Sequence, residues 1–258
     1  MKSLHTDSCL SVRGLEMHFG GIKALHGVDF DIESGMITGI IGPNGAGKTT
    51  VFNLMTGVFK PTKGVIMLGD KKLVGLPPHK IARLGLTRTF QTVRVFGMMT
   101  VLENVMVGRH PRTRSGFISA LFKPPSERRE EKQIVRDAIE KLKLVGLADK
   151  AHMRADCLPM GHLRLLEIAR ALATEPRYIL LDEPAAGLNS KETLELGELL
   201  RKIRENGVTP VVVDHDMALV MDVCDKIIVL NYGEKIAEGT PREIQNNPAV
   251  ISAYLGEP

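Results

Sequence analysis

The chain has 258 residues, a formal net charge of +4 and ordinary apolar and charged content, which suits a soluble domain with a substantial core. Three Tyr, no Trp and eight Phe, without a basic run between them, argue against nucleic acid as a partner. Cys9, Cys157 and Cys224 fit no metal-ligand spacing and indicate thiols in a reducing compartment. No apolar stretch approaches roughly 18 residues and no signal peptide is recognised. We therefore expect a soluble, cytoplasmic chain whose membrane role comes through a partner.

The first predicted elements are strands. Residues 28–32 alternate between apolar and polar side chains, which predicts a half-buried strand. Residues 37–41 predict a buried strand that leads into a Gly-rich turn and a helix beginning near Lys48. Further strands are predicted at residues 65–68, 178–181, 210–213 and 227–230, and an amphipathic helix at residues 191–206.

The middle of the chain has a different pattern. Residues 101–170 are mostly helical in pattern, interrupted by prolines, with a charged helix predicted at residues 126–144. Buried strands that alternate with helices predict an α/β fold around a largely parallel sheet. A helical segment inserted between the two halves of that sheet explains the change in pattern.

The run Gly42–Thr49 matches the P-loop motif. Glycine lets backbone N–H groups curve around phosphate, and the following helix adds the positive end of its dipole. Lys48 would reach the β- and γ-phosphates, and the hydroxyl of Thr49 would ligate Mg²⁺. A flexible turn is the alternative, but the predicted strand before it and helix after it favour nucleotide binding.

An acidic pair follows the buried strand that begins at Tyr178. Asp182 ends that strand and can hold Mg²⁺ opposite Thr49. Glu183 is placed to polarise an attacking water. Alone, two acids after an apolar run indicate only a strand end; together with a P-loop they indicate ATP hydrolysis.

Two polar residues carry a weaker signal. Gln91 precedes the helical segment, and His215 follows the strand predicted at residues 210–213. Either alone is more typical of a hydrogen-bonded structural residue. Their order relative to the P-loop and the acidic pair predicts two sensors of the γ-phosphate.

In these motifs and their order the chain resembles the ABC ATPases over nearly its whole length. The resemblance implies a P-loop NTPase of ABC type, with a mostly parallel core, an N-terminal antiparallel β part and an inserted helical subdomain. It implies a first part of the nucleotide-binding core at residues 1–90, a helical subdomain at residues 91–170 and a second part of the core at residues 171–258.

The resemblance also assigns roles to single residues. Phe19, which could otherwise be a packed apolar residue, would stack on adenine. The residues expected to bind ATP are Phe19, Gly42, Pro43, Asn44, Gly45, Ala46, Gly47, Lys48, Thr49 and Thr50. Those expected to act in hydrolysis are Lys48, Gln91, Glu183 and His215, with Mg²⁺ held by Thr49, Gln91 and Asp182. A dimer loop is expected at Gly187, Leu188 and Asn189.

Several stretches narrow the resemblance. The chain is similar to the ATPases of branched-chain amino acid importers, in particular the longer of their two kinds. The similarity lies in the stretches Arg88–Gln91, Val101–Val105, Glu183–Asn189 and Ala253–Glu257. The insert Pro111–Glu130 strengthens the resemblance to the longer kind. The implied partners are permease subunits, a second ATPase and an extracytoplasmic binding protein. The implied location is the cytoplasmic face of the inner membrane, as a peripheral subunit.

The signature motif departs from the family pattern Leu-Ser-Gly-Gly-Gln. Here it consists of Leu158, Pro159, Met160, Gly161 and His162. Pro159 has neither the hydroxyl nor the N–H that would meet a partner chain's γ-phosphate, although proline suits a first helical turn. In a head-to-tail dimer each signature motif serves the nucleotide of the other chain. A homodimer would therefore have two impaired sites, and a heterodimer with a partner of normal signature only one; both arrangements remain open. Asn189, where many members have Asp, is usual in the branched-chain group.

Two apolar patches are candidates for contact with a membrane partner. The first comprises Val95, Phe96, Met98 and Met99, and the second Phe117–Phe122. Methionine-rich surfaces adapt to helices. Ordinary core is the alternative for the first patch, and a cover over the helical insert for the second.

Five functions are weighed at this point. A transport ATPase is favoured, because Lys48, Thr49, Asp182, Glu183 and His215 are all present. A regulatory module with low turnover would explain the altered signature. An ABC ATPase of another transporter is also possible. A nucleic-acid-associated member would be expected to carry two ATPase units or long coiled coils, and a phosphotransferase would not need Gln91, Asn189 and His215 in this order.

Overall fold

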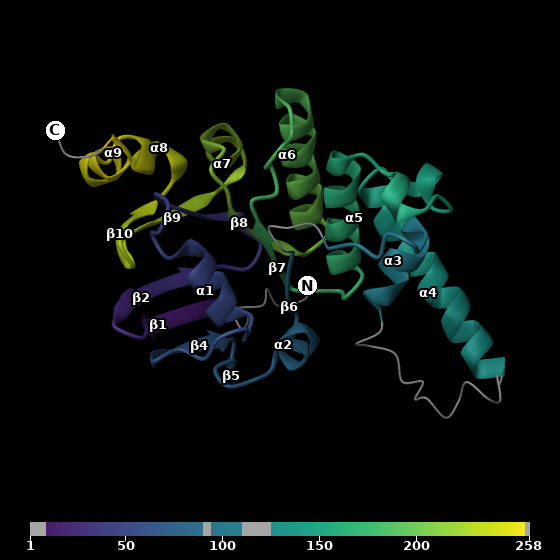
Figure 1. Ribbon diagram of the computed structural model, residues 1–258, viewed down its shortest axis with the longest axis horizontal. Coiled ribbons are helices and arrows are strands. Elements are labelled where there is room, and N and C mark those ends of the chain that lie inside the picture. Colours follow the sequence, from purple (N-terminus) through teal and green to yellow (C-terminus); the bar gives the residue numbers. More distant parts are fainter. Residues whose placement is uncertain (1–8, 90–93, 110–124, 256–258) are drawn as a thin grey trace, which may run out of the picture. The chain divides into compact units, whose positions relative to one another are not determined.

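The computed structural model describes residues 9–89, 94–109 and 125–255, the side chains of residues 125–131 and 255 excepted. The chain divides into two compact units, which can be followed by colour in Figure 1. Unit 1 comprises Met1–Arg88 and Arg177–Pro258, and unit 2 comprises Thr89–Pro176. Unit 2 is therefore inserted into the sequence of unit 1.

The first sheet of unit 1 is antiparallel, with its strands in the order β2-β1-β4-β5. The strands are β1 (Leu10–Phe19), β2 (Ile22–Ile32), β4 (Lys63–Leu68) and β5 (Lys71–Lys72). Val28 and Phe30 are buried while Asp29 between them is exposed, because successive side chains of a strand point to opposite faces. This confirms the half-buried strand predicted at residues 28–32.

The second sheet of unit 1 has the order β10-β9-β3-β8-β7-β6 and is parallel except for β10. Its strands are β3 (Thr38–Ile41), β6 (Leu86–Arg88), β7 (Tyr178–Asp182), β8 (Thr209–Val213), β9 (Lys226–Asn231) and β10 (Glu234–Gly239). The predicted largely parallel sheet is confirmed. Since β8 lies between β3 and β7, the carboxyl ends of these three strands share one edge, where α/β sheets bind their ligands.

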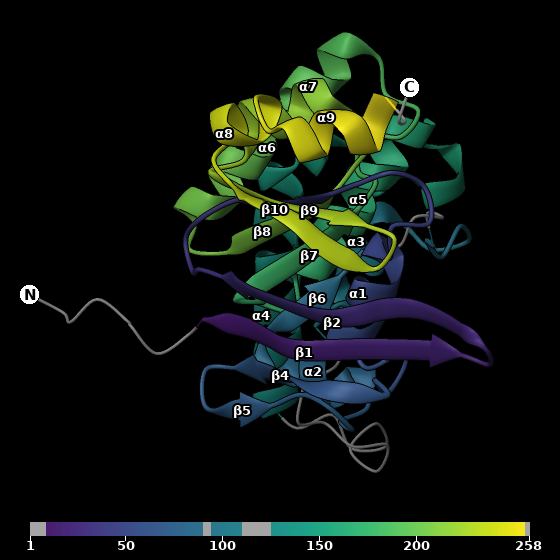
Figure 2. The same ribbon diagram turned by 90° about the vertical axis from the view of Figure 1, so that its left-hand side faces the viewer.

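The main hydrophobic core of unit 1 includes residues of both sheets and of α1 (Lys48–Met55), whose Val51, Phe52 and Met55 are fully buried. Figure 2 shows α7 (Met217–Val223), α8 (Pro241–Gln245) and α9 (Pro248–Leu255) on the side of the second sheet away from the first. The remaining helices are α2 (Pro78–Leu84), before β6, and α6 (Ser190–Glu205), between β7 and β8. The two helices predicted in this unit are confirmed.

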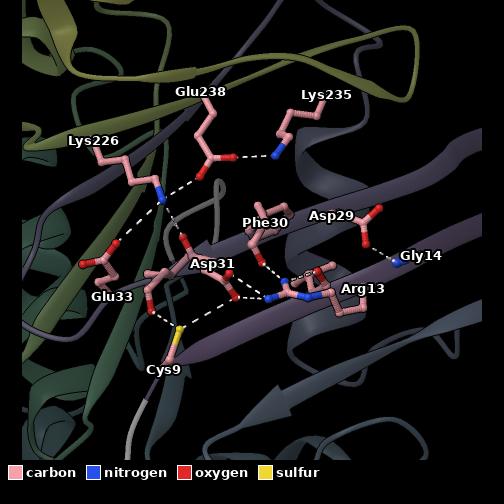
Figure 3. A network of polar contacts seen from close by, with 12 residues as sticks. Cys9, Arg13, Gly14, Asp29, Phe30, Asp31, Glu33, Lys226, Lys235 and Glu238 are labelled. Carbon is pink, nitrogen blue, oxygen red and sulfur yellow. Dashed lines mark hydrogen bonds and ion pairs between the residues drawn. The ribbon is translucent and has the colours of Figure 1, made fainter. Parts of the chain in front are cut away.

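A polar network joins the two sheets of unit 1 (Figure 3). Lys226 of β9 pairs with Glu238 of β10 at 2.5 Å and with Glu33 at 4.0 Å. Its Nζ also donates to the main-chain oxygen of Asp31 in β2 at 3.3 Å. The Asp31 carboxylate in turn accepts two hydrogen bonds of 2.7 Å from Arg13 of β1. The Arg13–Asp31 pair is exposed and contributes about 1 kcal/mol or less, while the less exposed Lys226 connects β9 to both β10 and β2.

Unit 2 is helical. Its elements are α3 (Val101–Val107), α4 (Pro125–Leu144), α5 (Met160–Leu172) and two short 3-10 helices, η3 (Ala148–Lys150) and η4 (Ala155–Cys157). This confirms the helical middle of the chain and the helix predicted at residues 126–144. The patch Phe117–Phe122 lies outside the described residues. Among the helices of the described ranges, none is both long and apolar enough to cross a membrane.

A buried asparagine fixes the segment before α3. Asn104 is fully buried, and its Oδ1 accepts a hydrogen bond from the N–H of Phe96 at 2.8 Å. Its Nδ2 donates to the carbonyl oxygens of Phe96 and Thr100 at 3.0 and 2.9 Å. The hydroxyl of Thr100 then caps α3 in a reciprocal pair with Glu103. The backbone of residues 96–100 is thereby held in one conformation.

Candidate functional site

The Gly-rich loop Gly42–Thr49 connects β3 to α1, in the context that the sequence predicted. Gly42 has a φ of 149°, and a Cβ there would lie 2.0 Å from the carbonyl oxygen of Leu230. Gly47, with a φ of 102°, is the N-cap of α1, and its Cβ would lie 2.7 Å from the side chain of Leu25. Both positions therefore require glycine.

Hydrogen bonds close the loop into a tight turn. The N–H of Ala46 donates to the carbonyl oxygen of Pro43 at 3.2 Å, and that of Gly233 donates to the carbonyl oxygen of Ala46 at 3.1 Å. Asn44 and Gly45 are exposed at the tip. The first N–H groups of α1 have no partner within the helix, so loop and helix together present donors and a positive dipole end to an anion.

Lys48 lies at the base of this loop and is only 6% exposed. Its Nζ donates to the carbonyl oxygens of Gly42 at 2.7 Å and of Pro43 at 2.9 Å. Burial lowers the pKa of Lys48, and the carboxylates of Glu183 and Asp182 oppose that shift. The ammonium group is therefore held beside the loop and close to both acids. Thr49 is exposed and Thr50 half-buried.

Asp182 ends β7 and is 2% exposed. It forms a buried ion pair with Arg88, which ends the neighbouring strand β6. Arg88 also donates to the side-chain oxygen of Asn53 on α1 at 2.6 Å, and its guanidinium lies 5.5 Å from the ring centre of Phe52. The position of the Asp182 carboxylate is thus fixed from α1 and from the next strand.

Glu183 has a left-handed backbone, with a φ of 49°, which is uncommon for a residue other than glycine. Its N–H donates to the carbonyl oxygen of Val213 at 2.7 Å, which anchors this conformation to β8. The Nε2 of His215 lies 3.0 Å from Oε1 of Glu183. Residues 32 positions apart in sequence therefore meet at the ends of β7 and β8. Strained backbone of this kind gathers at functional sites.

Asp214 is a buried carboxylate next to this pair that the sequence analysis did not single out. Its Oδ2 accepts a hydrogen bond from the N–H of Ala185 at 2.8 Å. Its Oδ1 accepts from the N–H groups of His215 and Asp216 at 2.7 and 2.9 Å. Burial raises the pKa of Asp214, and these three backbone donors oppose the rise. Asp214 ties the segment after Glu183 to the one that carries His215.

Phe19, at the end of β1, is 43% exposed, so it is not an ordinary core residue. Its ring packs edge to face against Phe59, with ring centres 5.4 Å apart and planes at 78°. Part of the Phe19 ring therefore remains available for another contact.

The predicted signature residues lie in unit 2, at the start of α5. Pro159 is the N-cap of this helix and makes no side-chain capping hydrogen bond. Leu158 is buried, Met160 is 59% exposed, and Gly161 and His162 are half-buried. Gln91 falls outside the described residues, so its predicted role stays a prediction.

The predicted dimer loop precedes α6. Gly187 has a φ of 79°, and the N–H of Leu188 donates to the carbonyl oxygen of Ala185 at 3.0 Å. The side-chain oxygen of Asn189 accepts hydrogen bonds from the N–H groups of Lys191 and Glu192, so it caps α6. Asn189 therefore has a structural role in the single chain, whatever it contacts in a dimer.

Sequence reasoning missed Arg88, Asn53 and Asp214. Arg88 and Asp182 are separated by 94 positions, and only the pairing of β6 with β7 brings them together. Asp214 had a local signal, since it stands between a buried strand and a predicted catalytic histidine. An acid at such a place indicates either a ligand or, as here, an acceptor for backbone N–H groups.

Known proteins share much of this sequence. Residues 25–186 match the model of the ABC transporter family, and residues 234–258 match that of the branched-chain amino acid ATP-binding cassette transporter. The chain is 50% identical, over 96% of its length and 98% of the relative's, to the high-affinity branched-chain amino acid transport ATP-binding protein LivG of Escherichia coli K12.

Solved structures show the same fold. The chain is similar to the ADP conformation of MJ1267, an ATP-binding cassette of an ABC transporter, with 32% identity, a TM-score of 0.85 and coverage of 98% of this chain and 100% of that one. It is also similar to the ATP-binding cassette MJ0796, in a dimeric post-hydrolysis state bound to ADP and Pi, with 28% identity, a TM-score of 0.76 and coverage of 90% and 99%. From its phosphate loop, its acidic strand end and these relatives, the chain belongs to the ABC transporter family as an ATP-binding cassette ATPase.

Proposed function

We propose that the chain is the ATP-hydrolysing motor subunit of an importer for branched-chain or other hydrophobic amino acids. The observation that carries the proposal is the contact of 3.0 Å between His215 and Glu183, beside the base of a P-loop. A nucleotide module without turnover would have no need of a histidine held against a carboxylate at this point. The substrate class comes from the printed description of the Escherichia coli relative, which is a branched-chain amino acid transport protein.

The phosphates of ATP would be held by residues 42–50. Backbone N–H groups and the dipole of α1 attract the anion. Lys48 already points into this loop, and moving its Nζ from the two carbonyl oxygens to the β- and γ-phosphates exchanges neutral acceptors for charged ones.

Mg²⁺ fits the donors at this site. Mg²⁺ is usually bound by one or two protein oxygens together with phosphates and waters. The hydroxyl of Thr49 and the carboxylate of Asp182 are hard oxygen donors of the kind that Mg²⁺ prefers, with Gln91 as a third candidate. Bound there, Mg²⁺ would neutralise charge on the phosphates.

Glu183 would act as the general base. A water oxygen bonds to the γ-phosphorus while its proton passes to the carboxylate of Glu183, and the bond from phosphorus to the β–γ bridging oxygen breaks. His215 orients that carboxylate through its contact with Oε1. The products are ADP and phosphate.

A second ATPase chain would complete each site. The dimer of MJ0796 supports a paired arrangement in this family. In a head-to-tail pair, the N-terminus of α5 from one chain would close over the γ-phosphate bound by the other. ATP then holds the pair together and hydrolysis separates it. The pair would be formed with a second kind of ATPase or with another copy of this chain.

The altered signature motif predicts slow ATP hydrolysis by the purified chain. Changing Pro159→Ser together with Met160→Gly adds a hydroxyl and an N–H at the start of α5 and removes an exposed side chain. Since a hydrogen bond to a charged group contributes about 1.5–3 kcal/mol, we expect the purified chain to hydrolyse ATP at least about tenfold faster. Steady-state phosphate release at saturating Mg-ATP and high protein concentration measures this.

The matched control for that change is Pro159→Ala with Met160→Gly, which supplies the N–H and the space but no hydroxyl. Serine at an N-cap also stabilises a helix by about 1 kcal/mol, so thermal unfolding is followed in parallel. Rates equal to that of the original chain in both variants would show that α5 serves the phosphate without this residue, and the idea of an impaired site would be wrong.

Unit 2 presents an apolar surface suited to a membrane partner. Phe96, Met98 and Met99 are 48, 79 and 38% exposed, which argues against ordinary core. Asn104 holds the backbone of Phe96, and the guanidinium of Arg170 lies 5.8 Å from its ring centre. A fixed backbone with exposed apolar side chains is what a docking surface for a permease helix requires. The chain would thereby be a peripheral subunit on the cytoplasmic face of the inner membrane, linked through the permease to an extracytoplasmic binding protein.

Replacing apolar side chains on this surface by charged ones tests the transport role. In cells that lack the native copy, a chain with Phe96→Glu and Met99→Glu should fail to restore leucine uptake and should no longer co-purify with an integral membrane protein. Its basal ATP hydrolysis should stay within about twofold of the original, because the changed side chains are exposed.

Leu194→Glu is the matched control, since Leu194 is a 65% exposed side chain on α6. It should restore uptake normally. Lysine uptake, which a site for hydrophobic amino acids does not serve, should be the same in all strains. Loss of basal hydrolysis in the Phe96 and Met99 variant would mean that these residues support the fold instead.

A further inference from the structure

Two phenylalanines from different parts of unit 1 form an exposed aromatic pair. Phe19 ends β1, and Phe59 lies in the connection between α1 and β4. They are 43 and 38% exposed, and their rings meet edge to face at 5.4 Å. Val58, which precedes Phe59, is 47% exposed, and Ile22, which opens β2 after Gly20 and Gly21, is 73% exposed. Two short segments of unit 1 thus expose four large apolar side chains to solvent.

The backbone that carries Phe59 is fixed by α1. The carbonyl oxygen of Asn53 accepts hydrogen bonds from the N–H groups of Val58 and Phe59 at 2.9 and 3.3 Å. Asn53 is also the residue whose side chain accepts from Arg88, the partner of Asp182. The helix that begins at Lys48 in the phosphate loop therefore also sets the position of Phe59.

The same connection is fixed to β1 immediately before Phe19. The N–H of Thr62 donates to the carbonyl oxygen of Glu16 at 2.9 Å, and the N–H of His18 donates to the hydroxyl of Thr62 at 3.0 Å. Both rings are therefore carried by backbone that is hydrogen-bonded on either side of the pair. The backbone positions from which the two rings project are thereby fixed relative to each other.

We propose that Phe59 is a positioning residue for the nucleotide base: it holds the ring of Phe19 at the angle at which an adenine stacks on it. The proposal rests on the proposed function, since it takes Phe19 as the residue that contacts the base. An unsupported phenylalanine at the end of a strand can rotate about its Cα–Cβ bond, and binding a base would have to restrict that rotation. With Phe59 against it, Phe19 is restricted before the base arrives.

The contribution is specific to the base. Both side chains are hydrocarbon rings, so they can stack on or support a flat base but offer nothing to phosphate. Phosphate binding depends instead on the loop Gly42–Thr49 and on Lys48. Removing Phe59 should therefore weaken the binding of nucleotides and leave base-free polyphosphate unaffected, a separation that a general loss of structure would not produce.

The experiment compares Mg-ADP with Mg-pyrophosphate by calorimetric titration, using ADP because it is not hydrolysed. For Phe59→Ala we expect the Kd of ADP to rise about two- to tenfold, the range of an aromatic pair interaction, and the Kd of pyrophosphate to stay unchanged. Phe59→Tyr, which keeps the ring, should restore ADP binding. Val58→Ala is the matched control from the same connection and should bind both ligands as the original chain does.

Phe59→Leu keeps apolar bulk without a ring and serves if the alanine variant does not fold; it should show the same selective loss for ADP. An equal loss for both ligands would overturn the proposal, because Phe59 would then support the phosphate loop through α1. No loss for either ligand would overturn it as well. If the original chain binds pyrophosphate but not ADP, or neither ligand, the proposed function itself fails and this inference falls with it.

Discussion

Replacing Glu183 by glutamine is expected to slow steady-state phosphate release about 10²–10⁴-fold, the usual contribution of a positioned general base. Glutamine keeps the shape of the side chain and can still hydrogen-bond to His215, which lies 3.0 Å from the carboxylate. It cannot take the proton of the attacking water. Binding of ATP, measured by calorimetry, should therefore persist while hydrolysis stops.

The control for this change is Glu243→Gln, which removes the same charge elsewhere in unit 1. Glu243 pairs with Thr240 in the capping box of α8, where glutamine serves as well as glutamate. Its rate should match that of the original chain. Unchanged hydrolysis by the Glu183 variant would show that another group accepts the proton, and the assignment of the base would be wrong.

Replacing Lys48 by alanine should weaken ATP binding about a hundredfold, because it removes the one side-chain cation placed by the loop to face the phosphates, and charge-assisted hydrogen bonds contribute about 1.5–3 kcal/mol each. The lost Nζ also leaves the carbonyl oxygens of Gly42 and Pro43 without this donor. Hydrolysis should fall below detection at ATP concentrations that saturate the original chain.

Lys72→Ala is the control for charge alone, since Lys72 is exposed in β5. Its ATP affinity should not change. Thermal unfolding separates a binding defect from a folding defect: the Lys48 variant should still unfold in one cooperative transition. Tight ATP binding by a folded Lys48 variant would mean that the backbone N–H groups of the loop carry the phosphates without it.

The predictable parts of the fold were those encoded by local pattern. The helix predicted at residues 191–206 was correct within one residue at each end, and the strand predicted at residues 28–32 is the last part of β2, which begins at Ile22. Both were visible because burial on one face leaves a period of two or of 3.6. The three-residue strand β6 was not predicted, because three residues are too few to show a period. The order of the strands could not be predicted either, because β8 lies between β3 and β7 although its first residue, Thr209, is 168 positions after Ile41, the last residue of β3.

In the candidate site, too, contiguous motifs could be predicted and contacts between distant residues could not. The P-loop and the acidic pair were visible because each is a contiguous run with its own chemistry. The contact of His215 with Glu183 could be expected only from the order of motifs, and the left-handed backbone of Glu183 not at all, because the bond from its N–H to Val213 is made across strands. The ion pair of Arg88 with Asp182 likewise depends on which strands are neighbours.

The three thiols differ in how much structure covers them. Cys157 of unit 2 is exposed, Cys9 is partly covered beside Asp31, and Cys224 is buried in unit 1, where desolvation raises its pKa to about 12. A Cβ at Gly39 of β3 would lie 3.0 Å from the sulfur of Cys224, so that thiol is packed against the second sheet. A thiol reagent reaches Cys224 only when this part of the sheet opens, because reaction needs both access and a thiolate. The rate at which Cys224 reacts therefore reports how often this part of unit 1 opens. The exposed thiol of Cys157 provides the reference rate for reaction without opening.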